Sequence, residues 1–136
     1  MMYKRMAVYC LFLVIFSVGC GRTIHFGPDK EKVEYVICKE SNLPAQLQEL
    51  LEEKKKKSCT FTFTNSMYTY LVVCYGSRPY SGYSVRIEEC SQTPEALYLR
   101  TQLIGPSARE PVVETETFPF LVLRCEKVDV LCIIDS

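Results

Sequence analysis

The order of hydrophobic and polar positions predicts a chain made mostly of short strands. The pattern is clearest in Cys59–Thr64, where phenylalanines and threonines alternate between two faces. Hydrophobic runs bounded by Gly, Pro, Asn and Ser predict the other strands. These are Val33–Cys38, Tyr68–Tyr75, Tyr83–Cys90, Ala96–Ile104, Phe118–Cys125 and Val130–Ile134. We interpret Tyr68–Tyr75 and Tyr83–Cys90 as one hairpin, and the last two strands as another.

One helix is predicted, from about Leu43 to Lys56. Ser41 and Asn42 are capping residues just before Pro44, and leucines then recur at three- and four-residue spacing to form one apolar stripe. Short strands with a single helix near the start indicate an α+β domain. We expect a mainly antiparallel β-sheet, sandwich-like or curled, with one N-terminal amphipathic helix lying on it.

The turn between Tyr75 and Ser84 is the main candidate for binding. Gly76 and Gly82 adopt positive φ without steric cost and Pro79 fixes its own φ, so residues 76–83, the arch, form a stiff connection. We expect Arg78 and Tyr80 to lie exposed at its tip and to anchor a protein partner. The predicted partner-binding residues are Gly76, Arg78, Pro79, Tyr80, Ser81, Gly82 and Tyr83. The alternative is that these residues only set the turn, while Tyr75 and Tyr83 pack on the sheet.

The first residues have the composition of an export signal. Lys4 and Arg5 precede an apolar run of thirteen residues, which is short for a spanning helix of roughly 20 residues. The run ends in Ser-Val-Gly-Cys, which resembles a bacterial lipobox and implies lipidation of Cys20. We therefore predict a lipoprotein signal peptide at 1–19, a flexible tether at 20–32 and one domain at 33–136. The protein is then expected on the outer face of a bacterial cell membrane; simple secretion and a retained anchor are the alternatives.

Charge argues against nucleic acid as a partner. Removing Lys4 and Arg5 from sixteen basic residues leaves fourteen in residues 20–136, against sixteen Asp and Glu, for a net charge of about −2. Binding of phosphate backbones requires a concentrated basic surface, which this composition does not indicate.

Six cysteines follow Cys20, and most lie within or at the ends of apolar strands. A chain with this much Val, Ile, Leu, Phe and Tyr does not need a disulfide framework to replace a core. We expect mostly reduced cysteines used for packing, with one bridge between neighbouring strands as the alternative. They are Cys38, Cys59, Cys74, Cys90, Cys125 and Cys132.

No catalytic, cofactor-binding or metal-binding constellation is apparent. His25 is the single histidine and lies in the predicted tether, away from any nucleophile that would need a base. The sequence has no C-x-x-C pair and no glycine-rich phosphate loop. We expect a binding protein rather than an enzyme.

Several separate motifs resemble the lipoproteins that carry the C-terminal domain of the protease complex subunit PrcB. The likeness extends over about residues 33–134; Tyr80 and Ser81 replace the Thr and first Gly of the family pattern P-T-G-G-Y-S. The resemblance implies a surface-anchored accessory protein that stabilises or matures a protease complex and has no catalytic activity. The motifs are Leu43-Pro44, Tyr75-Gly76, Pro79-x-x-Gly82-Tyr83-Ser84, Leu103-Ile104-Gly105-Pro106 and Thr117-Phe118-Pro119-Phe120.

A second resemblance gives a different hypothesis. The pattern Pro79-x-x-Gly82-Tyr83 is similar to the N-P-T-T-G-Y loop of chagasin-type inhibitors of cysteine proteases. That resemblance implies a protease inhibitor that presents the Gly76–Tyr83 loop to a protease cleft.

Overall fold

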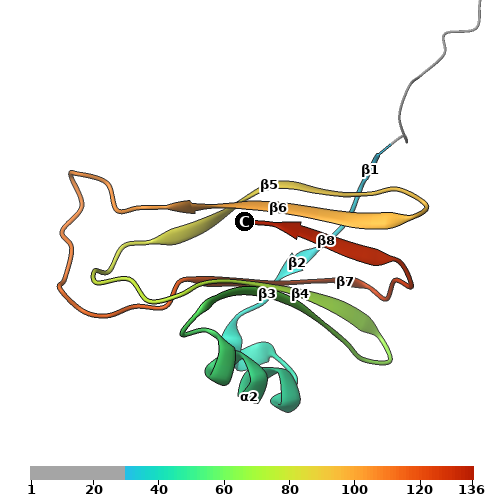
Figure 1. The fold of residues 1–136 in the computed structure, drawn as a ribbon, viewed down its shortest axis with the longest axis horizontal. Helices are drawn as coiled ribbons and strands as arrows, with labels where there is room; N and C mark the ends of the chain where they lie inside the picture. The colour runs from blue at the N-terminus through green and yellow to red at the C-terminus, as the bar shows by residue number, and fades with distance from the viewer. Residues whose placement is uncertain (1–29) are drawn as a thin grey trace, which may run out of the picture.

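Two four-stranded β-sheets lie face to face, and a helix covers the outer face of one of them (Figure 1). The computed structural model describes residues 30–136. The predicted signal peptide at 1–19, the lipidation site Cys20, His25 and tether residues 20–29 lie outside the described residues. The expected α+β class with mainly antiparallel sheet is confirmed.

The strands of the two sheets interleave along the chain. All strand pairs are antiparallel except β6 with β8, which is parallel. The first sheet has the order β1 (Glu31–Lys32), β5 (Ser84–Gln92), β6 (Ala96–Ile104), β8 (Leu131–Asp135). The second sheet has the order β2 (Val36–Ile37), β7 (Phe120–Glu126), β4 (Tyr68–Tyr75), β3 (Ser58–Thr64).

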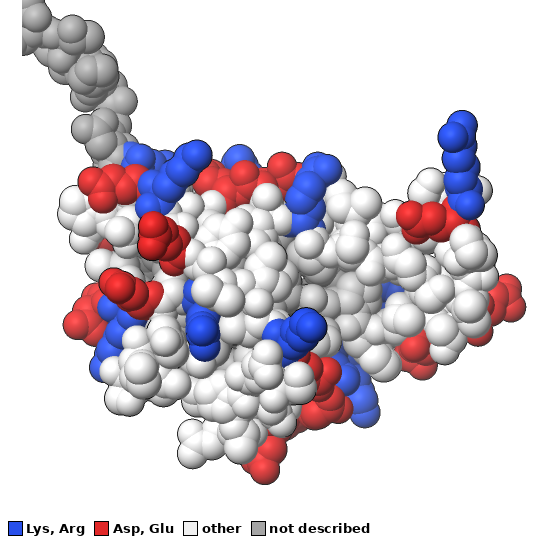
Figure 2. Space-filling model, turned by 180° about the vertical axis from the view of Figure 1, so that it is seen from behind, with Lys and Arg blue, Asp and Glu red and all other residues white. Residues whose placement is uncertain are grey.

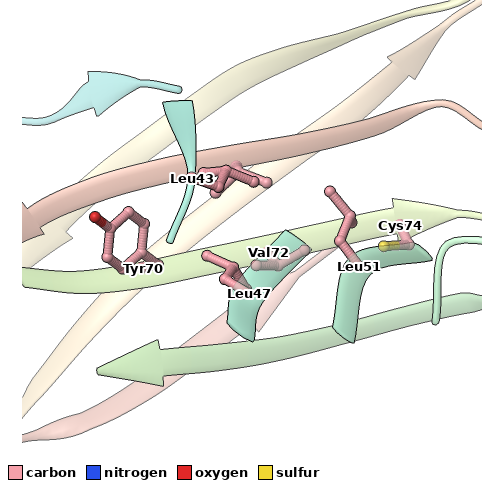
Figure 3. Packing of buried hydrophobic residues seen from close by; sticks show 7 residues of the cluster. Leu43, Leu47, Leu51, Tyr70, Val72 and Cys74 are labelled. Carbon is pink, nitrogen blue, oxygen red and sulfur yellow. The ribbon is translucent and has the colours of Figure 1, made fainter. Parts of the chain in front are cut away.

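The helix α2 (Ala45–Lys54) lies within the predicted range and follows a short 3₁₀ turn at Glu40–Asn42. Its leucine stripe packs on the outer face of β4, as Figure 3 shows for Leu47 against Val72 and Leu51 near Cys74. Leu47 and Leu51 are fully buried because they lie between the helix and this face of the sheet. No helix within residues 30–136 has both the length and the hydropathy that crossing a membrane requires.

A second hydrophobic cluster fills the space between the sheets. Because side chains alternate along a strand, β4 sends Leu71 and Val73 into this space while Tyr70, Val72 and Cys74 face α2. A hydrogen bond of 2.6 Å between the Tyr75 and Thr101 hydroxyls also joins the sheets. The buried members of the cluster are Leu71, Val73, Leu97, Leu99, Leu121, Leu123 and Cys125.

Both predicted hairpins are wrong. β4 and β5 lie in different sheets, so the arch connects two layers, and β7 and β8 are likewise divided between the sheets. The apolar run of β4 is buried on both faces, which makes it an inner strand whose two edges are taken by β3 and β7. β8 instead extends the first sheet beside β6.

The predicted strand at Val33–Cys38 is two short strands in different sheets. Glu31 and Lys32 pair with the end of β5, and Val36 and Ile37 pair with β7, so residues 33–35 cross between the layers. Val33 turns inward and packs against the core between the sheets. Residues 31–32, assigned to the tether from the sequence, are therefore part of the folded domain.

Candidate functional site

The arch is held at both ends by glycines in the left-handed region. Gly76 has φ 77° and Gly82 has φ 92°, as their type predicts. A Cβ atom on Gly76 would lie 3.0 Å from the backbone nitrogen of Ser58, and one on Gly82 would lie 2.8 Å from the Cβ of Pro106. Both positions therefore require glycine, and each glycine places the chain against a neighbouring segment.

A second loop, residues 105–119, braces the arch along its length. Both loops lie at the same end of the sandwich, on the left in Figure 1. Arg78 and Thr117 exchange two backbone hydrogen bonds, of 2.8 and 2.9 Å. The Ser81 amide donates to the Val113 carbonyl at 3.0 Å, and the Val113 amide donates to the Ser81 hydroxyl at 2.9 Å. We call residues 76–83 and 105–119 together the loop pair.

Side-chain hydrogen bonds add to this bracing. The Thr117 hydroxyl donates to the Tyr80 carbonyl at 2.7 Å, and the Ser77 hydroxyl donates to the Glu116 carboxylate at 2.7 Å. These bonds satisfy polar groups of the arch with partners from the second loop. The arch is therefore half of a two-loop unit and does not project alone.

Arg78 is not the exposed tip residue that the sequence led us to expect. Its side chain is half-buried, and its Nη2 donates to the Tyr75 carbonyl at 3.2 Å, while its Nε is buried without a hydrogen-bond partner. The guanidinium thus folds back over the base of the arch. Its role in this position is to hold the loop, since it presents little charge to a partner.

Tyr80 does lie outward, with 40% of its surface exposed. In the second loop, Val112 and Val113 are exposed by 45% and 63%. Of the other predicted contact residues, Pro79 and Gly82 are exposed, Ser81 and Tyr83 are half-buried, and Gly76 is buried. The outer surface of the loop pair therefore carries apolar side chains from both loops, beside the exposed charged residues Arg109, Glu110, Glu114 and Glu116 of the second loop.

A shallow groove of about 310 Å³ runs between the arch and the start of β7. Tyr83 lines one side, and Phe118 and Phe120 line the other. Sequence reasoning treated Phe118 and Pro119 as a strand beginning and did not connect them with the arch, because no local pattern reports which loops meet. The lining residues are Ser81, Gly82, Tyr83, Thr117, Phe118, Pro119 and Phe120.

The surface charges do not gather by sign. On the face shown in Figure 2, basic and acidic residues are interspersed around an uncharged centre, and neither forms a continuous patch. Such a distribution supplies no strong field to attract a highly charged ligand to this face.

The cysteines of residues 30–136 are free thiols in this structure. Burial is the main cause that raises the pKa of Cys74 to about 12 and the pKa of Cys125 to about 11. Thiols of this kind are mostly protonated at neutral pH and react only through a small thiolate fraction. Within the same residues, no three Cys, Asp, Glu or His side chains come close enough together to hold a metal ion.

Comparison with known proteins identifies a segment that contains the whole loop pair. Residues 69–126 match the family model described as PrcB C-terminal. The match is shorter than the resemblance over residues 33–134 and includes β4, the arch, β5, β6, the second loop and β7. No curated protein and no solved structure is significantly similar to the chain.

Proposed function

Since residues 69–126 belong to the PrcB C-terminal family, we propose that this chain is a non-catalytic accessory protein of a protease complex and binds its partner through the loop pair. The family name associates such domains with a protease complex. The proposed role is to support the stability or maturation of that complex. The whole loop pair falls within the matched segment, which favours it over the helix and the short N-terminal strands as the shared binding element.

The observation that carries the proposal is a rigid loop pair with apolar side chains on its outer surface. Backbone bonds between Arg78 and Thr117 and between Ser81 and Val113 fix the two loops to each other. A loop that is already ordered loses little conformational entropy on binding, so contacts made by Tyr80 contribute more fully to affinity. Exposed aromatic residues on rigid supports are typical binding hot spots.

The location predicted from the sequence forms part of the proposal. We place the protein outside the cytoplasm, held on the bacterial membrane through a lipid on Cys20. A diacylglyceryl group supplies two acyl chains, which is enough for stable anchoring. The partner is then an envelope protein exposed to the same compartment.

Replacing Tyr80 with alanine should weaken binding of the partner by about tenfold or more, because a central exposed aromatic anchor is lost. The measurement is crosslinking in native membranes, followed by capture of the tagged protein and mass spectrometry of the captured proteins. The result expected for the wild type is capture of a protease or protease-complex subunit, and the result expected for Tyr80→Ala is its loss.

Tyr35 offers a matched control, because it has nearly the same exposure, 39%, and lies before β2, outside the loop pair. Tyr35→Ala should retain the partner. Equal capture by wild type and Tyr80→Ala would contradict binding through the arch. If the purified wild type instead slows a cysteine or serine protease at stoichiometric amounts, the chagasin-like inhibitor hypothesis is favoured over the accessory role.

Replacing Cys20 with serine should move the protein from the membrane fraction to the soluble fraction, because the anchoring acyl chains are absent. Mass spectrometry of the wild-type protein should show a mature chain that begins at Cys20 and carries a diacylglyceryl group. A mature chain that keeps residues 1–19, or one that begins beyond Cys20, would contradict the lipoprotein assignment.

A further inference from the structure

Cys59 and Cys74 are directly opposite each other in neighbouring antiparallel strands. Cys59 lies on β3 and Cys74 on β4, and they are register partners. Directly opposite residues of an antiparallel pair project from the same face of the sheet. Both side chains pack in the cluster beneath α2, so the two thiols share one environment.

The backbone geometry of this pair fits a cross-link. The Tyr75 amide donates to the carbonyl of Pro119, the residue before β7, so the adjacent residue Cys74 directs its own backbone groups toward β3. Cys59 and Cys74 therefore form a hydrogen-bonded pair, with Cα atoms roughly 5.5 Å apart. This separation is within the range of about 4.4–6.8 Å found for disulfides.

The two thiols differ in access. Cys74 is 1% exposed, whereas Cys59 is half-buried on β3, the edge strand of the second sheet, with its Sγ 3.5 Å from the Lys54 carbonyl. After burial, the proximity of Cys59 is the next cause that raises the pKa of Cys74. The more accessible Cys59 is the thiol that an external reagent reaches first.

We propose that Cys59 and Cys74 are a reversible disulfide site, closed by exchange with an external disulfide of the glutathione or oxidoreductase class. The Cys59 thiolate attacks the external disulfide and releases one thiol. The Cys74 thiolate then attacks Cys59 Sγ and releases the second thiol. One S–S bond forms, two protons are lost from the cysteines, and the two electrons reduce the external disulfide to two thiols.

The proposed disulfide site lies at the base of the arch. Cys74 is two residues before Gly76, and Ser58, next to Cys59, is the residue nearest to a Cβ atom placed on Gly76. A covalent bond between the strands here fixes β3 against the point where the arch leaves β4. The site therefore goes beyond partner binding and gives the domain two redox forms.

A peptide containing these two cysteines and no others makes the proposal testable. Trypsin cleaves after Lys57 and Arg86, whereas the bond after Arg78 is protected by Pro79, so one fragment covers residues 58–86. The purified full-length protein is equilibrated in buffers of rising ratios of oxidised to reduced glutathione, alkylated and digested. We expect this fragment to lose both alkyl groups and to weigh two hydrogen atoms less than the unmodified peptide. A reducing buffer should reverse the change.

Two half-buried cysteines provide matched variants. Cys59→Ser should leave Cys74 alkylated in every buffer, whereas Cys90→Ser, in the core between the sheets, should form the bridge as the wild type does. Retention of both alkyl groups on the wild-type fragment in the most oxidising buffer would overturn the proposal. Linkage of either residue to a different cysteine would overturn it as well. Neither measurement involves a protein partner. A negative result would therefore contradict the disulfide site without contradicting the proposed binding function.

Discussion

Leu47→Ala should lower the free energy of unfolding by about 2–5 kcal/mol, the usual cost of removing a fully buried leucine side chain. Leu47 has no exposed surface and sits at the centre of the contact between α2 and β4 (Figure 3). The ten-residue helix is too short to be stable in isolation, so its order depends on this contact. Chemical denaturation followed by circular dichroism measures the loss.

Leu50 is the matched control, because it lies on the same helix but is only half-buried. Leu50→Ala should cost about 1 kcal/mol, since less apolar surface is withdrawn from water at this position. Equal losses for the two variants would show that α2 does not pack on the sheet through Leu47. The same result would leave the burial of the outer face of β4 without an explanation.

The second large effect is expected at the end of the arch. Gly82→Ala should destabilise the domain by about 1–3 kcal/mol and reduce capture of the partner. Its φ of 92° is strained for any residue with a Cβ atom, and that atom would lie 2.8 Å from the Cβ of Pro106. The clash with Pro106 is relieved if the two loops move apart, which also disturbs the bonds between Ser81 and Val113.

Gly105→Ala tests whether the effect is specific, since it makes the same chemical change in the other loop. A Cβ atom on Gly105 would be 3.8 Å from its nearest neighbour, the Tyr83 ring, which is an ordinary contact. Thermal unfolding should give a midpoint close to wild type for Gly105→Ala and a clearly lower one for Gly82→Ala. If both variants unfold together with the wild type, the proposed packing of the arch against Pro106 is wrong.

Local sequence patterns predicted most helices and strands of the fold, but not which strands pair with each other. The bounds of β4 and β6 match the predicted ranges, and α2 lies inside its own. A strand pattern indicates which side chains are apolar, but it does not indicate which other strand pairs with that strand. The apolar run Tyr68–Tyr75 therefore predicted a strand correctly, while its assignment to a hairpin with the next strand was wrong.

The candidate site was predicted in the same partial way. The positive φ of Gly76 and Gly82 follows from residue type, and Tyr80 is exposed as expected. The inward position of Arg78 depends on the Tyr75 carbonyl and on the second loop, which lies almost forty residues further along the chain. Such long-range pairing leaves no trace in local composition, because residues 108–114 read simply as a polar loop.

The interleaving of the two sheets sets when this protein can fold. β1 pairs with the end of β5, and β2 pairs with β7. β8, the last strand of the structure, pairs with β6. Neither layer is complete until its late strand, β7 or β8, has been made. Folding that waits for such distant pairings is slow. A rigid shape is thus reached late, when strands from both ends of residues 30–136 have come together.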